Sequence, residues 1–350
     1  MTMMTRPPRL LTVLLNWRTA PMTLRAAEAG LAAMAALREA MPGARTDMVI
    51  VDNDSGDGSF EMLRDRARAR GWTEGGAVRV IQSGHNGGFG AGNNVGIRTG
   101  MADGEAPDFV YLLNSDAFPE PGALLALIRA LEADPSAGIA GSYIHGEDGT
   151  PHETAFRFPS ILSEFEDAAR IGPISRALAR HRVALPMPTQ TTPVDWLAGA
   201  SMMIRREVLD RIGLFDETFF LYFEETDLCL RAARAGFRTL YVPESRVPHI
   251  GSVSTGMKGW AKVPTYWFDS RLHYFTKSHG TVYAMGCTLA QAVGGALHRL
   301  RPAASRSRPP AFLRDLLSHD MAAWRSGGAG RSRPRGPDAP RRLHDMKGKS

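Results

Sequence analysis

The 350 residues suffice for one large α/β domain with an appendage, or for two domains. Hydrophobic (43%) and charged (22%) contents are ordinary for a globular protein, and Cys229 and Cys287 are too few for a disulfide framework. Residues 298–350 carry a net charge of +9, which leaves −3 on the preceding 297 residues, so a basic nucleic-acid-binding body is excluded. We therefore expect a protein of the reducing cytoplasm with no nucleic-acid partner.

The first half of the chain alternates apolar runs with helical patterns. Strands are predicted at 10–15, 48–51, 78–81, 109–113 and 139–144, and helices at 22–40, 59–70, 95–101 and 119–131. The first apolar run leads directly into Asn16-Trp17-Arg18, which indicates a buried strand and no signal peptide. The alternation favours a parallel, doubly wound sheet with right-handed crossovers.

The second half is less regular. Residues 145–193 look like an insertion over the sheet edge, with one short helix at 161–169. After it we predict a mixed strand at 195–204, a helix from Glu224 to a Gly236 cap, a strand at 237–242, a loop at 247–254, helices at 260–300 and a short helix at 311–324. The corresponding domains are 1–255, a helical extension at 256–300, and a basic, disordered tail at 301–350.

Polar clusters follow three of the predicted strands. They are Asp52–Asp57, Asn86–Asn94 and Asn114–Asp116. Ligands of such sheets bind beyond the carboxyl ends of the strands. Turn chemistry accounts for any one cluster alone, but three on one edge favour a binding site.

Asp116 is the candidate metal ligand, because a carboxylate after a buried strand can hold a hard cation. His249 is a candidate second ligand, since imidazole suits Mn²⁺ better than Mg²⁺. The alternatives are an Asp that begins the turn before Pro119 and a histidine that is merely exposed.

Three carboxylates stand together in Phe223-Glu224-Glu225-Thr226-Asp227-Leu228, directly after an aromatic run. Apolar rings make a carboxylate costly to ionise, which raises its pKa toward the range of a general base. The alternative interpretation is an acidic first helical turn that is stabilised by the helix dipole.

The glycine-rich stretch at 87–92 allows close approach of backbone to a phosphate or sugar, and it also partly matches a dinucleotide-binding fingerprint. The match is poor, because Asn93 stands where the third glycine belongs. The stretch also follows the third strand, whereas the fingerprint belongs to the first βα turn. A dehydrogenase is therefore disfavoured.

Five motifs in series carry a family resemblance. They are Leu14-Leu15-Asn16-Trp17, Val51-Asp52-Asn53-Asp54-Ser55, Asn86-Gly87-Gly88-Phe89-Gly90-Ala91-Gly92-Asn93-Asn94, Leu112-Leu113-Asn114-Ser115-Asp116 and Phe223-Glu224-Glu225-Thr226-Asp227-Leu228. Over residues 8–280 the chain resembles family 2 glycosyltransferases, in particular bacterial rhamnosyltransferase-like members. This implies a GT-A (Rossmann-like) α/β fold: a mostly parallel central sheet flanked by helices, with a C-terminal helical extension.

The resemblance also implies roles for individual residues. Glu225 occupies the position of the base that deprotonates the acceptor hydroxyl, and Asp116, with His249, would bind Mg²⁺ or Mn²⁺. The residues expected at the nucleotide-sugar donor are Asn16, Asp52, Asp54, Asn86, Gly87, Asn93, Asn114 and Ser115. Those expected at the sugar or acceptor pocket are Trp196, Gly199, Glu224 and Asp227. Two departures are notable, because Asn114 replaces the first Asp of an Asp-x-Asp site and Glu225 replaces a commoner Asp.

The activity implied is an inverting transfer of a sugar, rhamnose first among the candidates, to a glycan or lipid-linked glycan in cell-surface polysaccharide synthesis. The alternatives are a galactosyl-, glucosyl- or mannosyltransferase with a UDP or GDP donor, and a degenerate scaffold that binds nucleotide or glycan. The apolar stretch 281–297 has 17 residues, too few to span a bilayer. Two interpretations remain for this stretch and the basic tail that follows it. Together they could dock peripherally on the anionic inner face of the plasma membrane, or the tail could be solvated and disordered.

Overall fold

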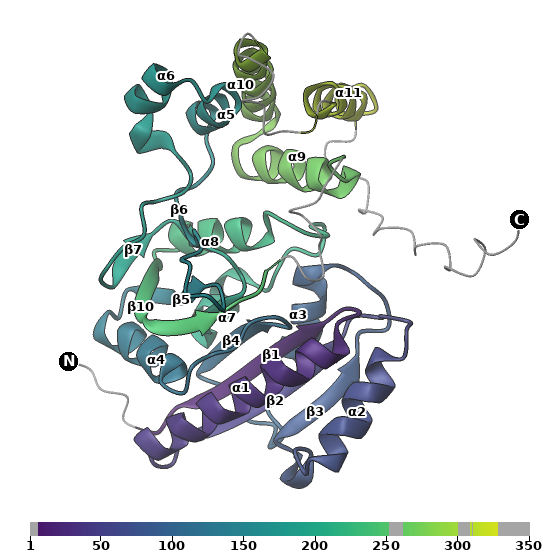
Figure 1. The fold of residues 1–350 in the computed structure, drawn as a ribbon, viewed down its shortest axis with the longest axis vertical. Coiled ribbons are helices and arrows are strands. Elements are labelled where there is room, and N and C mark those ends of the chain that lie inside the picture. Colours follow the sequence, from purple (N-terminus) through teal and green to yellow (C-terminus); the bar gives the residue numbers. More distant parts are fainter. Residues whose placement is uncertain (1–5, 252–261, 300–308, 310, 328–350) are drawn as a thin grey trace, which may run out of the picture.

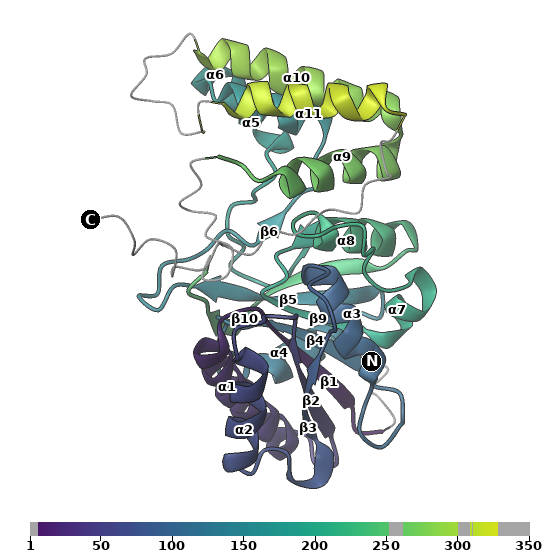
Figure 2. The same cartoon turned by 90° about the vertical axis from the view of Figure 1, so that its right-hand side faces the viewer.

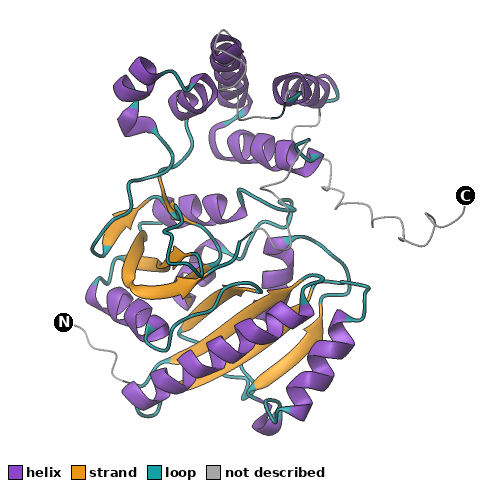
Figure 3. Ribbon diagram, in the orientation of Figure 1, coloured by secondary structure: helices purple, strands orange, loops and turns teal. Residues whose placement is uncertain are grey.

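The computed structural model describes residues 6–251, 262–299, 309 and 311–327. Helices cover both faces of one large sheet, and a second group of helices forms a layer beyond one edge of this sandwich (Figure 1). Figure 2 shows that the two parts are joined near α8 and α9, while Figure 3 shows that the described residues of the outer layer form helices and connecting loops, without strands. The predicted α/β class is confirmed.

The main sheet has eight strands in the order β3-β2-β1-β4-β9-β5-β10-β7. Their bounds are β1 Arg9–Asn16, β2 Arg45–Asp52, β3 Val78–Gln82, β4 Phe109–Asn114, β5 Ala137–His145, β7 Thr192–Val194, β9 Ser201–Arg205 and β10 Arg238–Pro248. Among them β9 runs antiparallel to β4 and β5, and β7 runs antiparallel to β10, while the other pairs are parallel. The sheet is thus mostly parallel, as expected.

The prediction of one mixed strand at 195–204 is wrong. The segment divides into β8 (Trp196–Leu197), which pairs with β6 (Ala155–Phe156) in a separate ribbon, and β9 of the main sheet. The turn between β8 and β9 requires a glycine at position 199, because a Cβ there would lie only 2.9 Å from Cζ of Phe89.

Helices on the two faces bury alternate residues of the strands. Leu10 and Leu14 of β1 pack in one core, whereas Leu11 and Val13 pack in the other. The first core is covered by α1 (Ala20–Ala40), α2 (Ser59–Ala69) and α4 (Ala123–Ala133), and the second by α3 (Phe89–Thr99), α7 (Arg206–Ile212) and α8 (Glu224–Arg234). Buried on both faces, these strands read as continuous apolar runs.

Two predicted boundaries need correction. Helix α3 begins at Phe89, six residues before the predicted start, because the glycines let the helix pack tightly on β1. A Cβ on Gly92 would lie 2.5 Å from Leu15, and one on Gly96 would lie 2.4 Å from Val13. Strand β10 continues to Pro248, so the predicted loop at 247–254 starts too early, and its residues 252–254 lie outside the described residues.

The outer layer contains α5 (Ile161–Ala169), α6 (Gly172–Ala177), α9 (Thr265–His279), α10 (Thr281–Arg299) and α11 (Phe312–Arg325). The predicted helix at 161–169 is confirmed, but it does not lie over the sheet edge. It packs against α10, because Gly294 of α10 lies against the backbone of Phe165. The 256–300 extension thus shares its layer with part of the insertion. The predicted boundary at 255 and most of the predicted tail lie outside the described residues.

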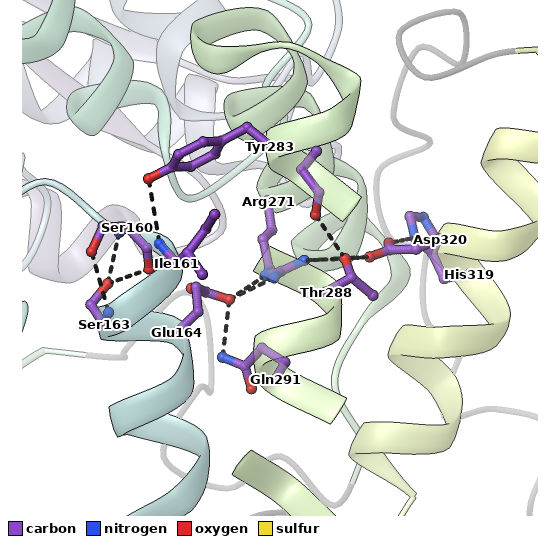
Figure 4. Close-up of polar contacts among 11 residues, drawn as sticks. Ser160, Ile161, Ser163, Glu164, Arg271, Tyr283, Thr288, Gln291, His319 and Asp320 are labelled. Carbon is purple, nitrogen blue, oxygen red and sulfur yellow. Dashed lines mark hydrogen bonds and ion pairs between the residues drawn. The ribbon is translucent and has the colours of Figure 1, made fainter. Parts of the chain in front are cut away.

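A buried charge network holds this layer together (Figure 4). Arg271 of α9 is 1% exposed and binds Glu164 of α5 at 2.6 Å and Asp320 of α11 at 3.4 Å. Gln291 of α10 donates to the same Glu164 oxygen at 3.0 Å. Arg271 also donates to Thr288 of α10 at 3.4 Å, so four helices from distant parts of the sequence meet at one guanidinium.

Among the helices of the described chain, none combines the length and the apolar character that crossing a bilayer requires. Cys229 and Cys287 are both buried and free, in accord with the absence of a disulfide framework.

Candidate active site

The end of β4 and the segment after β10 meet at Asp116 and His249. Nε2 of His249 lies 3.0 Å from Oδ1 of Asp116, and the backbone amide of Ile250 donates to the Asp116 carbonyl at 3.1 Å. Asp116 is 4% exposed. The two predicted metal ligands, 133 positions apart, are thus brought side by side.

The end of β2 is organised by a fully buried aspartate. Oδ1 of Asp52 accepts from the side chains of Asn16 at 2.7 Å and Ser55 at 2.6 Å, and Oδ2 accepts from the Ser55 amide at 3.1 Å. Asp54, by contrast, is exposed and has a left-handed backbone with φ 54°. The buried carboxylate therefore shapes the loop, and Asp54 is the acid that this loop presents to solvent.

The glycine-rich stretch is held by amide side chains. Oδ1 of Asn86 accepts from the Asn53 side chain and from the Gly88 amide, both at 3.0 Å, and Asn93 donates to the Phe89 carbonyl at 3.0 Å. At Gly88, with φ +90°, a Cβ would overlap the Phe220 carbonyl at 1.8 Å. Gly87 and its neighbours are thereby fixed against the aromatic run that precedes α8.

Tyr222 and Phe223 enter α8 in a conformation that non-glycine residues rarely adopt. Their φ angles are 70° and 68°, in the left-handed region. Two consecutive residues in this region store strain, which is typical of functional sites. The strained entry directs the next residues, Glu224 and Glu225, to different surroundings.

Glu225 lies partly buried at the wall of a cavity. The backbone amide of Gly199 donates to its Oε1 at 3.2 Å. Burial raises the pKa of Glu225, and the hydrogen bond from Gly199 only partly offsets this. A raised carboxyl pKa makes a stronger base, as a proton acceptor requires.

The cavity beside Glu225 has a volume of about 910 Å³. Its aromatic lining consists of Phe156, Trp196, Tyr222, Phe223 and Trp267. Trp196 is stacked on Phe156 with a centroid distance of 4.2 Å and donates from Nε1 to the Arg157 carbonyl at 2.9 Å. Fixed aromatic faces beside a carboxylate suit the apolar face of a sugar.

The other predicted pocket residues lie elsewhere. Asp227 is 1% exposed, binds Arg231 at 2.7 Å and Lys277 at 2.7 Å, and does not line this cavity. Glu224 is equally buried, and its Oε2 has no hydrogen-bond partner. Gly199 contributes its amide to Glu225, while its neighbour Ala198 lines the cavity.

One short turn connects the metal-ligand pair with the cavity. The amide of Asn114, two residues before Asp116, donates to the Ala200 carbonyl at 3.0 Å, and the adjacent Gly199 holds Glu225. Ser115 is 5% exposed and accepts from Thr19 at 3.1 Å. The turn at 198–200 thus lies between the end of β4 and the start of α8.

Several cavity residues were missed in the sequence. Trp267 comes from α9, while Glu153, Arg170 and Arg182 come from the insertion. The run Tyr266-Trp267-Phe268 was a usable signal, because an aromatic cluster outside the sheet often marks a binding surface. No local pattern in the sequence brings the insertion arginines to Glu225.

The buried side chain of Glu224 leads us to expect that the stability of the fold falls as the pH rises. Burial, and next the charge of Glu225, raise its pKa well above the ordinary 4.5. The folded state therefore holds a proton that the unfolded state releases above pH 4.5, and stability falls as pH rises from there toward the folded pKa. Glu224→Gln removes this dependence, so we expect its unfolding free energy to exceed that of the parent by about 1–3 kcal/mol at neutral pH.

Urea unfolding across pH checks this expectation. The advantage of the variant should vanish below pH 4.5, where the parent carboxyl is protonated in both states. Glu207→Gln, an exposed acid in the first turn of α7, is the control and should show no such trend. Equal stability of Glu224→Gln and the parent at every pH would contradict the prediction.

Comparisons with known proteins agree with this geometry. The model of the family described as "Glycosyltransferase like family 2" matches residues 34–264. N-acetylglucosaminyl-diphospho-decaprenol L-rhamnosyltransferase of Mycobacterium tuberculosis is 31% identical over 221 residues, which are 60% of this chain and 68% of that protein. Rhamnosyltransferase WbbL of Escherichia coli is 30% identical over 167 residues, 46% of this chain and 60% of the relative.

Among solved structures, the mannosyltransferase PcManGT from Pyrobaculum calidifontis, in complex with GDP-Man and Mn²⁺, matches with a TM-score of 0.54 and 17% identity, covering 91% of this chain and 81% of that one. At this identity the likeness establishes the fold. The match to the family model covers well over half of the sequence. The chain therefore belongs to glycosyltransferase-like family 2, and it is a glycosyltransferase.

Proposed function

We propose that the chain transfers rhamnose from a nucleotide-diphosphate donor to a hydroxyl of a lipid-linked glycan, with inversion at the anomeric carbon. The observation that carries the proposal is Glu225, a carboxylate of raised pKa at the wall of an aromatic cavity. The choice of sugar and acceptor rests on the M. tuberculosis and E. coli relatives, both rhamnosyltransferases by name. The first of these names also supplies the acceptor class, a sugar linked through diphosphate to a polyprenol.

On the donor side, the predicted residues divide into two kinds. Asn16, Asp52, Asn93 and Ser115 are buried. Asn16, Asp52 and Ser115 hold the loops beyond β1, β2 and β4 in place, and Asn93 bonds to Phe89 within the first turn of α3. Asp54 is exposed, and Asn86, Gly87 and Asn114 are partly so. We assign direct donor contacts to this second set and the shaping of the loops to the first.

A divalent cation fits at Asp116 and His249. Nε2 of His249 and Oδ1 of Asp116 lie 3.0 Å apart, so these two side chains would be the residues that hold the cation when it is bound. The described residues contain no group of three or more metal-binding side chains, so the remaining ligands would come from water and the donor diphosphate. When bound, the cation would supply positive charge to the departing diphosphate.

Glu225 performs the proton transfer in this mechanism. Gly199 orients its carboxylate, and the aromatic residues of the cavity hold the acceptor sugar. Glu225 takes the proton of the acceptor hydroxyl while the hydroxyl oxygen forms its bond to the anomeric carbon. The bond to the nucleotide diphosphate breaks on the opposite side, and the diphosphate leaves with the electron pair.

Metal removal gives a direct prediction. Excess EDTA should reduce turnover by about 10²-fold or more, because the leaving diphosphate loses its counter-charge, and Mg²⁺ or Mn²⁺ should restore it. Asp116→Asn should reduce turnover similarly and weaken the response to added metal. The control is Asp210→Asn on α7, whose carboxylate is bound to exposed Arg206. Full turnover in excess EDTA would refute the metal site.

The function itself is tested with a panel of donors. The chain is incubated with dTDP-rhamnose, UDP-hexoses and GDP-mannose, with and without an N-acetylglucosaminyl-diphospho-lipid acceptor, and nucleotide diphosphate release and glycolipid product are measured. Acceptor-dependent release with dTDP-rhamnose alone is the expected result. Turnover with a UDP or GDP donor would replace the sugar assignment. Donor binding without release of nucleotide diphosphate would instead indicate a degenerate scaffold, the alternative that is suggested by Asn114 in place of the first Asp.

A further inference from the structure

Helix α10 carries an exposed apolar face. Val282, Met285, Leu289 and Val293 are 84%, 42%, 64% and 47% exposed, and their spacing of three and four residues places them along one side of the helix. No charged residue occurs from Thr281 to Leu297. We call these four residues the apolar face of α10. In Figure 2 the helix lies along the outer border of the helical layer, away from the sheet.

The orientation of this face is fixed by the opposite side of the helix. Gly294 lies within 3.0 Å, measured from its Cβ position, of Phe165 and Ala168 of α5, and Gly286 lies 2.9 Å from Ile161. Thr288 donates to Asp320 of α11 at 2.5 Å. Because its other side is fully used within the chain, α10 cannot rotate to bury the apolar face.

A cationic segment begins where α10 ends. Nδ1 of His298 lies 3.2 Å from the carbonyl of Ala169, the last residue of α5. The segment at 170–182 follows, which contains Arg170, Arg176, Arg180 and Arg182, all exposed, while no Asp or Glu occurs from 168 to 194. Both views show α6, which lies within this segment, next to α5 in the outer layer (Figures 1 and 2).

We propose that the apolar face of α10 and the segment at 170–182 together dock the enzyme on an anionic phospholipid bilayer. An uncharged apolar face bordered by arginines matches the boundary between acyl chains and acidic headgroups. Arg170 is already paired with Asp167 at 2.9 Å, but an interface with a protein of neutral or basic surface would leave Arg176, Arg180 and Arg182 uncompensated.

The docking surface is also connected to the acceptor cavity. Helix α5 packs on α10 with one side and lines the cavity through Ser163, Glu164 and Asp167. Arg170 and Arg182 belong both to the cationic segment and to the cavity lining. Docking would therefore place the cavity next to the membrane surface, where the glycan of a membrane-bound acceptor lies. This last step rests on the proposed function, whereas the docking itself does not.

Vesicle co-sedimentation of the full chain tests the proposal. Vesicles of phosphatidylcholine with phosphatidylglycerol should pellet the protein, and vesicles of phosphatidylcholine alone should not. Leu289→Glu with Val293→Glu should lower the partition coefficient about tenfold or more, because charge enters the apolar layer. Arg176→Gln with Arg180→Gln should lower it about twenty-fivefold, at about fivefold for each arginine.

The matched control is Met62→Glu on α2, an apolar residue of similar exposure (44%) on the body of the enzyme, which should bind like the parent. All variants keep the basic C-terminal residues, so equal binding of both double variants and the parent would assign docking to those residues and overturn the proposal. A dimer that Leu289→Glu dissociates, seen by light scattering together with failure to bind vesicles, would identify a second copy as the occupant and overturn it as well. Since the vesicles contain neither donor nor acceptor, these outcomes are independent of glycosyl transfer.

Discussion

Replacement of Glu225 by Gln is expected to reduce turnover by about 10²–10⁴-fold while donor binding is largely retained. The amide keeps the size of the side chain and can still accept from the Gly199 amide, which is 3.2 Å from Oε1 in the parent. It cannot accept a proton at the moment of attack. Steady-state kinetics with the lipid-linked acceptor and calorimetry with the donor separate the two effects.

The pH profile distinguishes lost chemistry from lost structure. Burial raises the pKa of Glu225, and only its ionised form is a base. The activity of the parent should therefore rise with pH, and the midpoint of this rise (the acidic limb of the profile) should lie above the ordinary pKa of a glutamate. This limb should be absent from the residual activity of Glu225→Gln. Glu207→Gln, an identical substitution in an exposed first helical turn, should leave rate and profile unchanged. Near-normal turnover of Glu225→Gln would remove Glu225 from its assigned role.

Arg271→Met is expected to destabilise the fold by about 3–5 kcal/mol, because it leaves buried carboxylates without their cation. Arg271 binds Glu164 at 2.6 Å and Asp320 at 3.4 Å, and its own side chain is 1% exposed. Although burial opposes its charge, His319 is held between Asp269 and Asp320, which raise its pKa to about 9. It remains a second cation at neutral pH, yet it does not contact Glu164 directly.

Urea unfolding at neutral pH measures this loss. The control is Arg206→Met, which breaks an exposed pair with Asp210 and should cost less than about 1 kcal/mol. Because Glu164 also lines the acceptor cavity, KM for the acceptor should rise more than KM for the donor. A loss below about 1 kcal/mol for Arg271→Met would show that apolar packing, and not this network, holds the layer.

Much of the sheet was predictable because its strands are buried on both faces. The runs at 10–15 and 48–51 predict β1 and β2, and the helix at 161–169 is confirmed as α5. Their signals are local, since apolar continuity marks a buried strand and helical spacing of apolar residues marks a helix. Asp116 and His249 were also named from the sequence, and the structure places them 3.0 Å apart.

Long-range pairing was not predictable. Nothing in the composition of Ser201–Arg205 specifies that it inserts antiparallel between β4 and β5. Gly90 and Gly92 read as a loop because glycine is unfavourable within helices, but they belong to α3, where Gly90 packs closely on Phe215 and Gly92 on Leu15 of β1. The side chains of Trp267 and Arg170 reach the cavity only because α5 and α9 belong to one layer.

The joining of Glu164 to Arg271 and Gln291 has a consequence for biosynthesis. Helix α5 emerges from the ribosome more than a hundred residues before the two side chains that bind Glu164, which are the Arg271 cation of α9 and the Gln291 amide of α10. The first strands and helices of the sheet can begin to fold while translation continues, yet one wall of the cavity beside Glu225 must wait for the C-terminal helices.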